Sequence, residues 1–206
     1  MIERTENLLE IIIVGLCLFT ALGRALKTRK KGWLILGLVY ASYLLGDLYW
    51  TLYLFFYGKT PAVFYVSELS WCAAYLFKLL LLRYYQTDEE RTVRSPVLWI
   101  IPVFITAFTI FYMTRGDYLL NLTEAILMCL LMIRSVQGLL SLWGTADRRK
   151  NLFAVTLIFC MIEYALWTSS CYWQGDTIRN TYFWFAALLI AMHPLFYWAV
   201  RKAEGE

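Results

Sequence analysis

The chain of 206 residues is 61% hydrophobic and only 17% charged, whereas soluble domains are about 45–50% apolar and about a quarter charged. This composition excludes a disordered chain, a collagen-like fibre and an ordinary soluble enzyme. It also argues against a nucleic-acid-binding module, because the meaning of the net charge of +4 depends on where the cations lie along the chain. With a mean hydropathy of +0.57, the sequence predicts an all-α polytopic membrane protein.

Seven segments are long and apolar enough to cross a bilayer, which takes about 20 mostly apolar residues. In chain order they are 7–26, 33–57, 61–84, 96–114, 118–142, 152–173 and 180–200. Short connections that contain glycine, proline and charged residues separate them, as is typical of turns between helices. The seven spans occupy nearly the whole chain, so we expect a single transmembrane domain, 1–206, with any function in the membrane or on its loops.

The cations are distributed unevenly between the two sides of these spans. Thirteen lysines and arginines lie on one side and four on the other. The rich side holds Arg24, Lys27, Arg29, Lys30, Lys31, Arg83, Arg91, Arg94, Arg148, Arg149, Lys150, Arg201 and Lys202, and the poor side holds Arg4, Lys59, Arg115 and Arg179. The positive-inside rule then predicts a plasma-membrane protein with its N-terminus outside and its C-terminus in the cytoplasm.

Two further cations, Lys78 and Arg134, lie inside spans, close to the side that is rich in positive charge. Long basic side chains near the end of a membrane helix reach the interface with their charged groups. We therefore expect both side chains to reach the cytoplasmic surface.

The cation pattern also suggests an internal repeat. The basic runs 29–31 and 148–150 precede the second and sixth spans, and Arg83 and Arg201 end the third and seventh. This spacing fits two parallel three-helix units joined by the fourth span, a 3+1+3 arrangement known among transporters. The same spacing also follows from alternating loops alone, and few residues are identical between the halves, so both interpretations stay open.

Two local signals predict where spans meet the membrane surface. Four tryptophans near span ends are expected to anchor at the interface, where indole rings are enriched: Trp33, Trp143, Trp173 and Trp198. Asn121 and Glu124 have the spacing of a capping pair, which predicts that the fifth span starts there at the interface.

Charged side chains inside spans mark candidate functional residues, because a charge at the centre of the bilayer costs about 2.5–3.5 kcal/mol on insertion scales. Asp47, Glu68 and Glu163 lie between the predicted midplane and the outer surface, and we expect no lysine or arginine in that layer. The single histidine, His193, lies in the inner half of the last span, directly before Pro194, which predicts a kink there.

Aromatic residues share helix faces with these acids, because spacings of three, four and seven residues return to one face. The three predicted faces are Tyr43, Asp47 and Trp50; Phe64, Glu68, Trp71 and Tyr75; and Glu163, Trp167 and Ser170. If the faces converge, they form an outward-opening, acidic cavity with aromatic walls that favours a cationic or proton-coupled ligand. Alternatively, each acid is protonated and hydrogen-bonded to a neighbouring helix, where it serves packing alone.

The leading hypothesis is a small-solute transporter or facilitator. Its predicted ligand-binding residues are Tyr43, Asp47, Trp50, Glu68, Trp71, Glu163, Trp167 and His193. One alternative is a seven-span sensory module that signals through a partner bound to its cytoplasmic loops. Another is an intramembrane enzyme that acts on lipid with a pair of carboxylates.

Other chemistries lack the residues that they need. The five cysteines are odd in number and have no C-x-x-C spacing, which argues against a disulfide framework or a zinc site: Cys17, Cys72, Cys129, Cys160 and Cys171. A single histidine disfavours a metalloenzyme, and no G-x-S-x-G motif is present. We expect no catalytic residue, metal, cofactor or nucleic-acid partner; the expected partners are the lipid bilayer and a small molecule, in an oligomeric state that the sequence leaves open.

Overall fold

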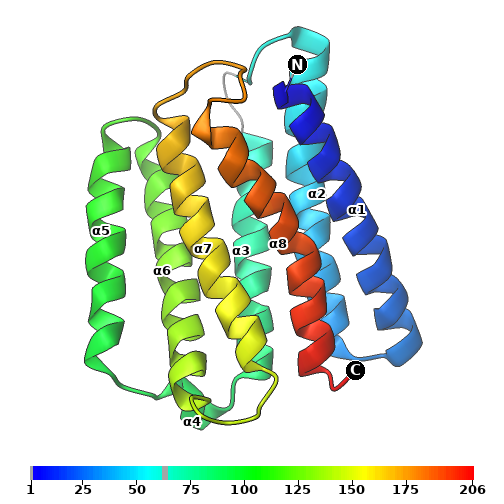
Figure 1. Cartoon of the computed structure of the whole chain (residues 1–206), viewed down its shortest axis with the longest axis vertical. Helices are drawn as coiled ribbons and strands as arrows, with labels where there is room; N and C mark the ends of the chain where they lie inside the picture. The colour runs from blue at the N-terminus through cyan, green and yellow to red at the C-terminus, as the bar shows by residue number, and fades with distance from the viewer. Residues whose placement is uncertain (1, 62–64) are drawn as a thin grey trace.

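The computed structural model describes residues 2–61 and 65–206, and within them the chain is helical with no strand. The elements in chain order are α1 (Ile2–Thr28), α2 (Lys31–Tyr57), α3 (Tyr65–Tyr85), α4 (Asp88–Arg91), the short 3-10 helix η1 (Pro96–Trp99), α5 (Ile100–Met113), α6 (Tyr118–Ser141), α7 (Lys150–Ser170) and α8 (Thr181–Ala203) (Figure 1). The all-helical prediction is confirmed. Phe64, placed by the sequence on the face of Glu68, lies outside the described residues.

Six helical segments of the described chain are long and apolar enough to cross a membrane. They are α1, α2, the continuous segment Pro96–Met113, α6, α7 and α8. This set has the length and composition of a multi-pass membrane protein. The six do not include α3, which carries Glu68, Lys78 and Arg83.

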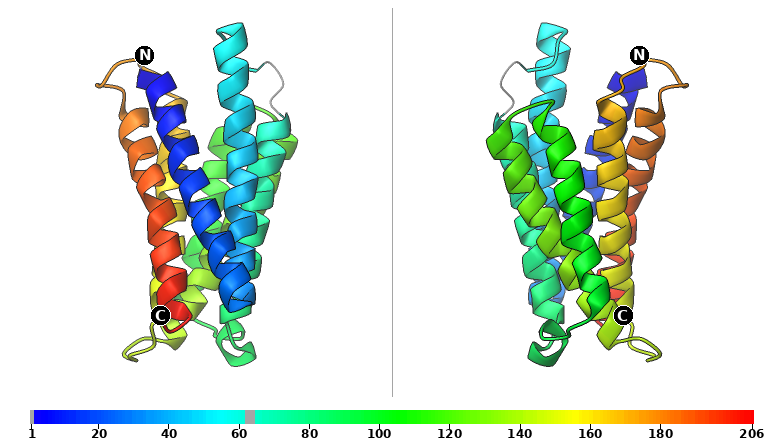
Figure 2. Two further views of the ribbon diagram at one scale, coloured as in Figure 1. Left: turned by 90° about the vertical axis from the view of Figure 1, so that its right-hand side faces the viewer. Right: turned by 90° about the vertical axis from the view of Figure 1, so that its left-hand side faces the viewer.

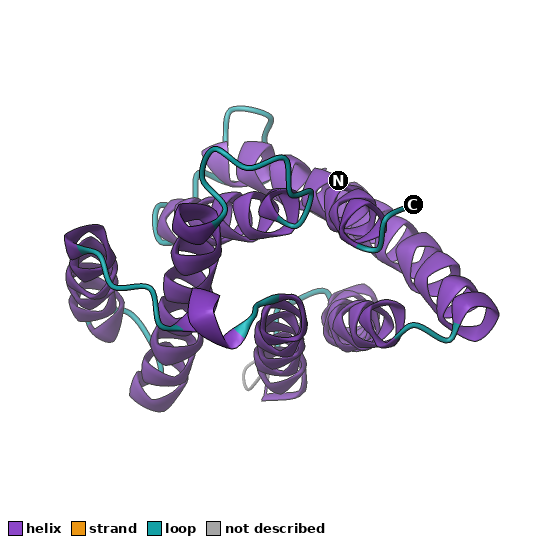
Figure 3. Cartoon of the chain, turned by 90° about the horizontal axis from the view of Figure 1, so that it is seen from below, coloured by secondary structure: helices purple, strands orange, loops and turns teal. Residues whose placement is uncertain are grey.

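Six of the seven long helices form a ring in the order α1, α2, α3, α6, α7, α8, where each helix contacts the next and α8 contacts α1. Figure 3 shows this ring along its axis, with α5 outside it against α6. The two termini lie at opposite ends of the bundle (Figure 1). The helices diverge toward the end that holds the N-terminus (Figure 2).

The start of α6 corrects one prediction. Asp117 Oδ1 accepts hydrogen bonds from the backbone N–H groups of Leu119 and Leu120, at 2.9 and 3.2 Å, and so caps the helix. The helix therefore begins at Tyr118, and Asn121 lies inside its first turn. The Asn121 side chain donates instead to the Tyr112 carbonyl. The predicted capping pair of Asn121 and Glu124 is therefore wrong.

One of the four predicted anchor tryptophans is also misplaced. Trp33 is fully buried, and its ring packs against that of Tyr197 with 5.0 Å between centroids. It joins α2 to α8 at the end of the bundle that holds the C-terminus. Trp143, in contrast, is 83% exposed, and Trp173 and Trp198 are partly exposed, as expected for side chains at a membrane surface.

Candidate functional site

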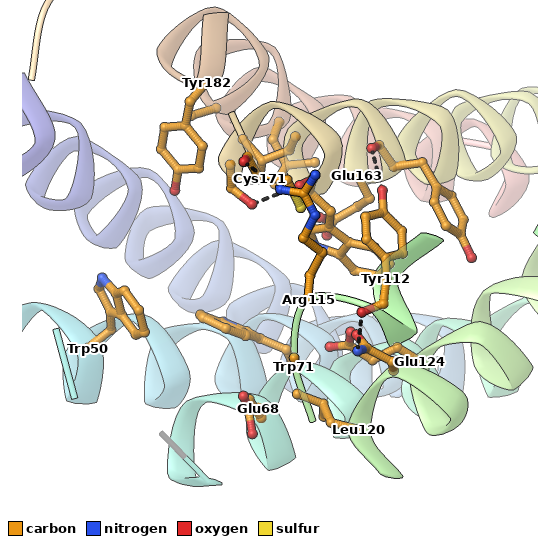
Figure 4. A pocket seen from close by; sticks show the side chains of 18 of the residues that line it. Trp50, Glu68, Trp71, Tyr112, Arg115, Leu120, Glu124, Glu163, Cys171 and Tyr182 are labelled. Atoms are coloured by element: carbon orange, nitrogen blue, oxygen red, sulfur yellow. Dashed lines mark hydrogen bonds between the residues drawn. The ribbon is translucent and has the colours of Figure 1, made fainter. Parts of the chain in front are cut away.

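A cavity of about 690 Å³ lies at the N-terminal end of the ring, where the helices diverge. Its volume falls within the range of about 300–1,000 Å³ that is typical of small-molecule sites. All of the ring helices contribute to its wall, together with the end of α5 and the loop between α5 and α6. Figure 4 shows acids and aromatic side chains from several helices facing this space.

The structure brings together seven of the eight predicted ligand-binding residues, all of which are described. Those that line the cavity are Tyr43, Asp47, Trp50, Glu68, Trp71, Glu163 and Trp167. His193 lies one helical turn beyond Leu189, which also lines the cavity, and is buried below the cavity. Its ring packs edge-on against Tyr43 at 5.1 Å, and its Nε2 lies 3.8 Å from Oε1 of Glu10.

Asp47 is held from one side only. The indole Nε1 of Trp71 donates to its Oδ1 at 2.9 Å, whereas the buried Oδ2 has no hydrogen-bond partner among the described residues. The indole reaches Asp47 because α2 and α3 approach closely at Gly46, whose carbonyl accepts from the Ser67 hydroxyl at 3.1 Å. A buried carboxylate oxygen left without a partner is costly, so this position favours a bound proton or cation.

Glu163 and Lys78 lie at the floor of the cavity. The Tyr75 hydroxyl donates to Oε1 of Glu163 at 3.0 Å. The Lys78 ammonium donates to the Tyr43 hydroxyl at 2.8 Å and lies 2.8 Å from the centroid of the Phe159 ring. Two separate hydrogen bonds thus join α3 to α7 and to α2 at the floor of the cavity.

The position of Lys78 corrects the prediction that its charge reaches the cytoplasmic surface. The side chain is only 1% exposed, because α3 presents it to the interior of the ring, where Tyr43, Phe159 and Phe196 surround its ammonium group. Arg134 does lie at the inner end, where it donates to the carbonyl of Arg91 in α4.

Five acids of the cavity wall were not among the predicted site residues. Three of them lie on α1, and the other two are Asp117 and Glu124. Glu3, Glu6 and Glu10 follow the spacing of one helix face, a signal that the sequence already contains. Glu3 and Glu6 precede the predicted first span, 7–26, whereas α1 begins at Ile2 and carries all three acids on one helix.

Among the described residues that line the cavity, eight carboxylates therefore face one cation, Arg115. Its guanidinium extends from the α5–α6 loop to the end of α7 and donates to the Cys171 carbonyl at 3.1 Å (Figure 4). It also packs over the rings of Phe111 and Tyr172, at 5.1 and 5.3 Å. These contacts hold the Arg115 guanidinium against the ends of α5 and α7, so Arg115 does not serve as a fixed partner of the acids deeper in the cavity.

Aromatic rings form much of the remaining wall. Trp50 packs beside Trp71 with 6.1 Å between ring centroids, and Trp167 packs edge-on against Tyr164 at 5.2 Å. The Tyr164 hydroxyl is buried and has no hydrogen-bond partner among the described residues. The cavity therefore combines negative charge with aromatic faces, which attract cations through their negative π-electron clouds.

The carboxylates are spread around the wall rather than gathered at one point. In the described part of the chain, no group of three or more histidine, cysteine, aspartate or glutamate side chains has the arrangement to hold a metal ion. The five cysteines are free thiols.

Comparison of the chain with protein-family models, with curated proteins and with solved structures finds no match.

Proposed function

We propose that the protein is a seven-span transporter of the plasma membrane that binds a cationic small solute in this cavity. The observation that carries the proposal is the excess of eight carboxylates over one guanidinium among the described residues that line an aromatic-walled space, with one further cation, Lys78, buried beneath it. Such a concave acidic site raises the local concentration of cations and holds them by charge and by cation–π attraction.

The seventh span of this proposal is α3. Its 21 residues correspond to about 30 Å at about 1.5 Å per residue, which matches the hydrocarbon thickness of a bilayer. It lies in the ring between α2 and α6, and Glu68 and Lys78 are buried there rather than presented to lipid. Of the charged residues of α3, Glu68 lines the cavity and Lys78 is buried beneath it.

The distribution of cations supports an outward-opening cavity. The thirteen cations of the rich side flank the ends of helices that lie opposite the cavity, near the C-terminus. By the positive-inside rule that end faces the cytoplasm, and the cavity faces the outside.

The order of helices around the ring supports transport over sensing or lipid chemistry. Two units, α1–α3 and α6–α8, follow one another around the ring, with α5 outside as the connection. This order is the one expected of transporters that are built from two parallel repeats. In those folds the solute site lies between the units, as this cavity does.

The test is flux in proteoliposomes that contain the purified protein, with a panel of labelled mono- and polyamines and an imposed pH gradient. Asp47→Asn and Glu163→Gln are expected to lower uptake at least tenfold, because each removes a charge from the cavity while keeping the side-chain shape. Glu89→Gln, a change of an exposed acid in α4, is the matched control and should transport normally.

Normal uptake by both cavity variants would overturn the proposal. Binding of a cation with no flux would favour the sensory alternative, and turnover of lipid by the purified protein would favour the enzyme. Equal insertion and thermal unfolding of all variants shows that a loss of flux is not a loss of folding.

A further inference from the structure

We propose that the ligand of the cavity is a linear polyamine, an extended cation with several ammonium groups separated by methylene chains. The proposal names the ligand class of the proposed transport site and so rests on the proposed function for its physiological role. Ligand binding itself is measured independently of flux.

The spacing of the acids favours an extended cation. Glu3, Glu6 and Glu10 occupy one face of α1, and the first and last are separated by about 10 Å along the helix axis, at about 1.5 Å per residue. Asp47 and Glu163 line the same cavity deeper in the bundle. The negative charge thus runs as a line from the mouth toward the floor.

Further acids lie around the opposite wall. Glu124, Glu68 and Asp117 line the same cavity, with Asp117 at its mouth. Carboxylates that share a site partly shielded from water repel one another. One monovalent cation neutralises one member of the line, whereas a polyamine neutralises several at once.

A compact metal ion fits this arrangement poorly. A divalent cation such as Ca²⁺ gathers six to eight oxygen atoms at about 2.3–2.6 Å. Within the described residues, no three potential ligands converge in this way. Because the negative charge is distributed along the cavity, an extended cation matches it better than a compact one.

Two buried polar atoms of the wall lack a partner, and a ligand that donates hydrogen bonds would satisfy both. Asp47 is 7% exposed and Tyr164 is 3% exposed; both line the cavity, and among the described residues neither Oδ2 of Asp47 nor the Tyr164 hydroxyl has a partner. An ammonium group carries several N–H donors and a positive charge, so it can satisfy both requirements of such a position.

Lys78 shows how the aromatic floor holds an alkylammonium group. Its ammonium is bonded to the Tyr43 hydroxyl and lies against the face of Phe159, and its methylene stem is buried. The cavity above repeats these components, with Trp71 and Trp167 beside the acids. The rings provide cation–π contacts for the ammonium groups and apolar contacts for the methylenes.

The experiment is isothermal titration of the purified protein in nanodiscs with spermidine, putrescine and n-butylamine at constant ionic strength. Affinity is expected to rise with the number of ammonium groups, with a Kd for spermidine at least tenfold lower than for n-butylamine. Glu6→Gln should weaken spermidine binding several-fold and leave n-butylamine nearly unchanged, and Asp47→Asn should weaken both. Glu89→Gln is the control and should bind as the wild type does.

Equal affinity for spermidine and n-butylamine would overturn the polyamine assignment, and so would full competition by Mg²⁺ at concentrations equal to that of spermidine. In either case flux of the monoamine would still support the transporter. Tight spermidine binding without flux would leave the ligand assignment standing and overturn the transporter.

A different observation, at the opposite end of the bundle, carries a second inference that also rests on transport. We infer that two matched ion pairs hold the inner end closed. Lys30 directly precedes α2, and its Nζ lies 3.2 Å from Oε2 of Glu204, directly after α8. Arg149 directly precedes α7, and its Nη2 lies 2.9 Å from Oε1 of Glu90, in α4 just after α3.

Each pair joins the middle helix of one three-helix unit to the end of the other unit. Tyr85, at the end of α3, connects them: its hydroxyl donates to the Glu204 carboxylate, and its carbonyl accepts from Arg149 at 2.7 Å. Both acid side chains are only 9% exposed, whereas the Lys30 and Arg149 side chains are 38% and 24% exposed, so the contacts are partly shielded from water. Separating the units at this end requires breaking both pairs, together with the more exposed pair of Arg24 and Glu206.

The test uses Cys160, a fully buried thiol of α7 beside Phe159, in a protein whose other cysteines are serine. In the double variant Glu90→Gln/Glu204→Gln, maleimide labelling of Cys160 from the cytoplasmic face is expected to be at least fivefold faster. Asp88→Asn removes the exposed pair of Arg91 and Asp88 inside α4 and is the matched control. Unchanged labelling in a folded double variant would overturn the inference, whatever the flux assay shows.

Discussion

Gly46 determines how closely α2 and α3 approach at the cavity. A Cβ atom at this position would lie 2.8 Å from Nε1 of Trp71 and 3.2 Å from the Ser67 carbonyl. The indole that it would meet is the group that holds Asp47. Glycine at position 46 therefore leaves room for the indole that binds Asp47, although Gly46 does not line the cavity itself.

Gly46→Ala is expected to displace the Trp71 indole and to weaken spermidine binding several-fold. It should also lower the thermal unfolding temperature, because the backbone carbonyl of Ser67 cannot move aside without shifting α3. Gly15→Ala is the matched control, since no atom lies within 4 Å of a Cβ atom there and alanine favours the helix. Wild-type binding by Gly46→Ala would show that the bond from Trp71 to Asp47 is dispensable.

At the scale of the element, Asp117 has two roles that substitution can separate. Its side chain caps α6, and its charge lies at the cavity mouth. Asp117→Ser keeps a capping oxygen and removes the charge, whereas Asp117→Ala removes both.

We expect Asp117→Ala to cost about 1 kcal/mol of stability, the usual value of an N-cap, and Asp117→Ser to cost a few tenths at most. Both variants should bind spermidine more weakly than the wild type and to a similar extent. Thermal unfolding and titration measure the two effects separately. Weak binding by the alanine variant alone would mean that Asp117 acts through the helix and not through its charge.

The loop between α6 and α7 carries a second acid whose environment is defined. The Arg149 guanidinium donates to Oδ2 of Asp147 at 2.7 and 2.9 Å and holds the pKa of that carboxyl below its usual value of 3.8. A lowered pKa in the folded state means that the carboxylate stabilises the fold above pH 3.8 and loses this contribution as the pH falls through the folded value.

Asp147→Asn should therefore be less stable than the wild type at pH 7, and the difference should shrink as the pH approaches 3. The effect is small because the loop is solvated. The measurement is the unfolding temperature of both proteins at a series of pH values. A difference that stays constant down to pH 3 would contradict a lowered pKa.

At the scale of the whole molecule, α3 decides the topology. With α3 as a span there are seven crossings, and the two termini lie on opposite sides of the membrane. Without it there are six, and the termini lie on one side. The bundle places the termini at opposite ends (Figure 1).

Epitope tags at the two ends test this directly. We expect antibody to reach an N-terminal tag on intact cells and a C-terminal tag only after permeabilisation. A third tag after Gly144, in the exposed turn between α6 and α7, should behave like the C-terminal tag. Equal accessibility of both terminal tags would overturn the seven-span proposal.

Much of the helical framework could be predicted from the sequence, because an apolar stretch of bilayer length has few alternatives to a helix. Two wrong predictions depend on neighbouring helices. The position of Lys78 and Trp33 along a helix predicts a surface for each, but α7 and α8 cover them. The other differences are local: Asp117 rather than Asn121 caps α6, and α1 begins before its apolar stretch and so includes Glu3 and Glu6.

The helices, their breaks and the faces that carry acids and aromatic rings follow from local periodicity and from the cost of placing polar groups in hydrocarbon, so they can be predicted from the sequence. Packing between helices brings these faces together, adds the three carboxylates of α1 to them and places Lys78 beneath the floor. The reason is physical: periodicity fixes where a side chain points relative to its own helix axis. The rotation of each helix in the ring is set by packing between helices distant in sequence, such as the approach of α2 and α3 at Gly46.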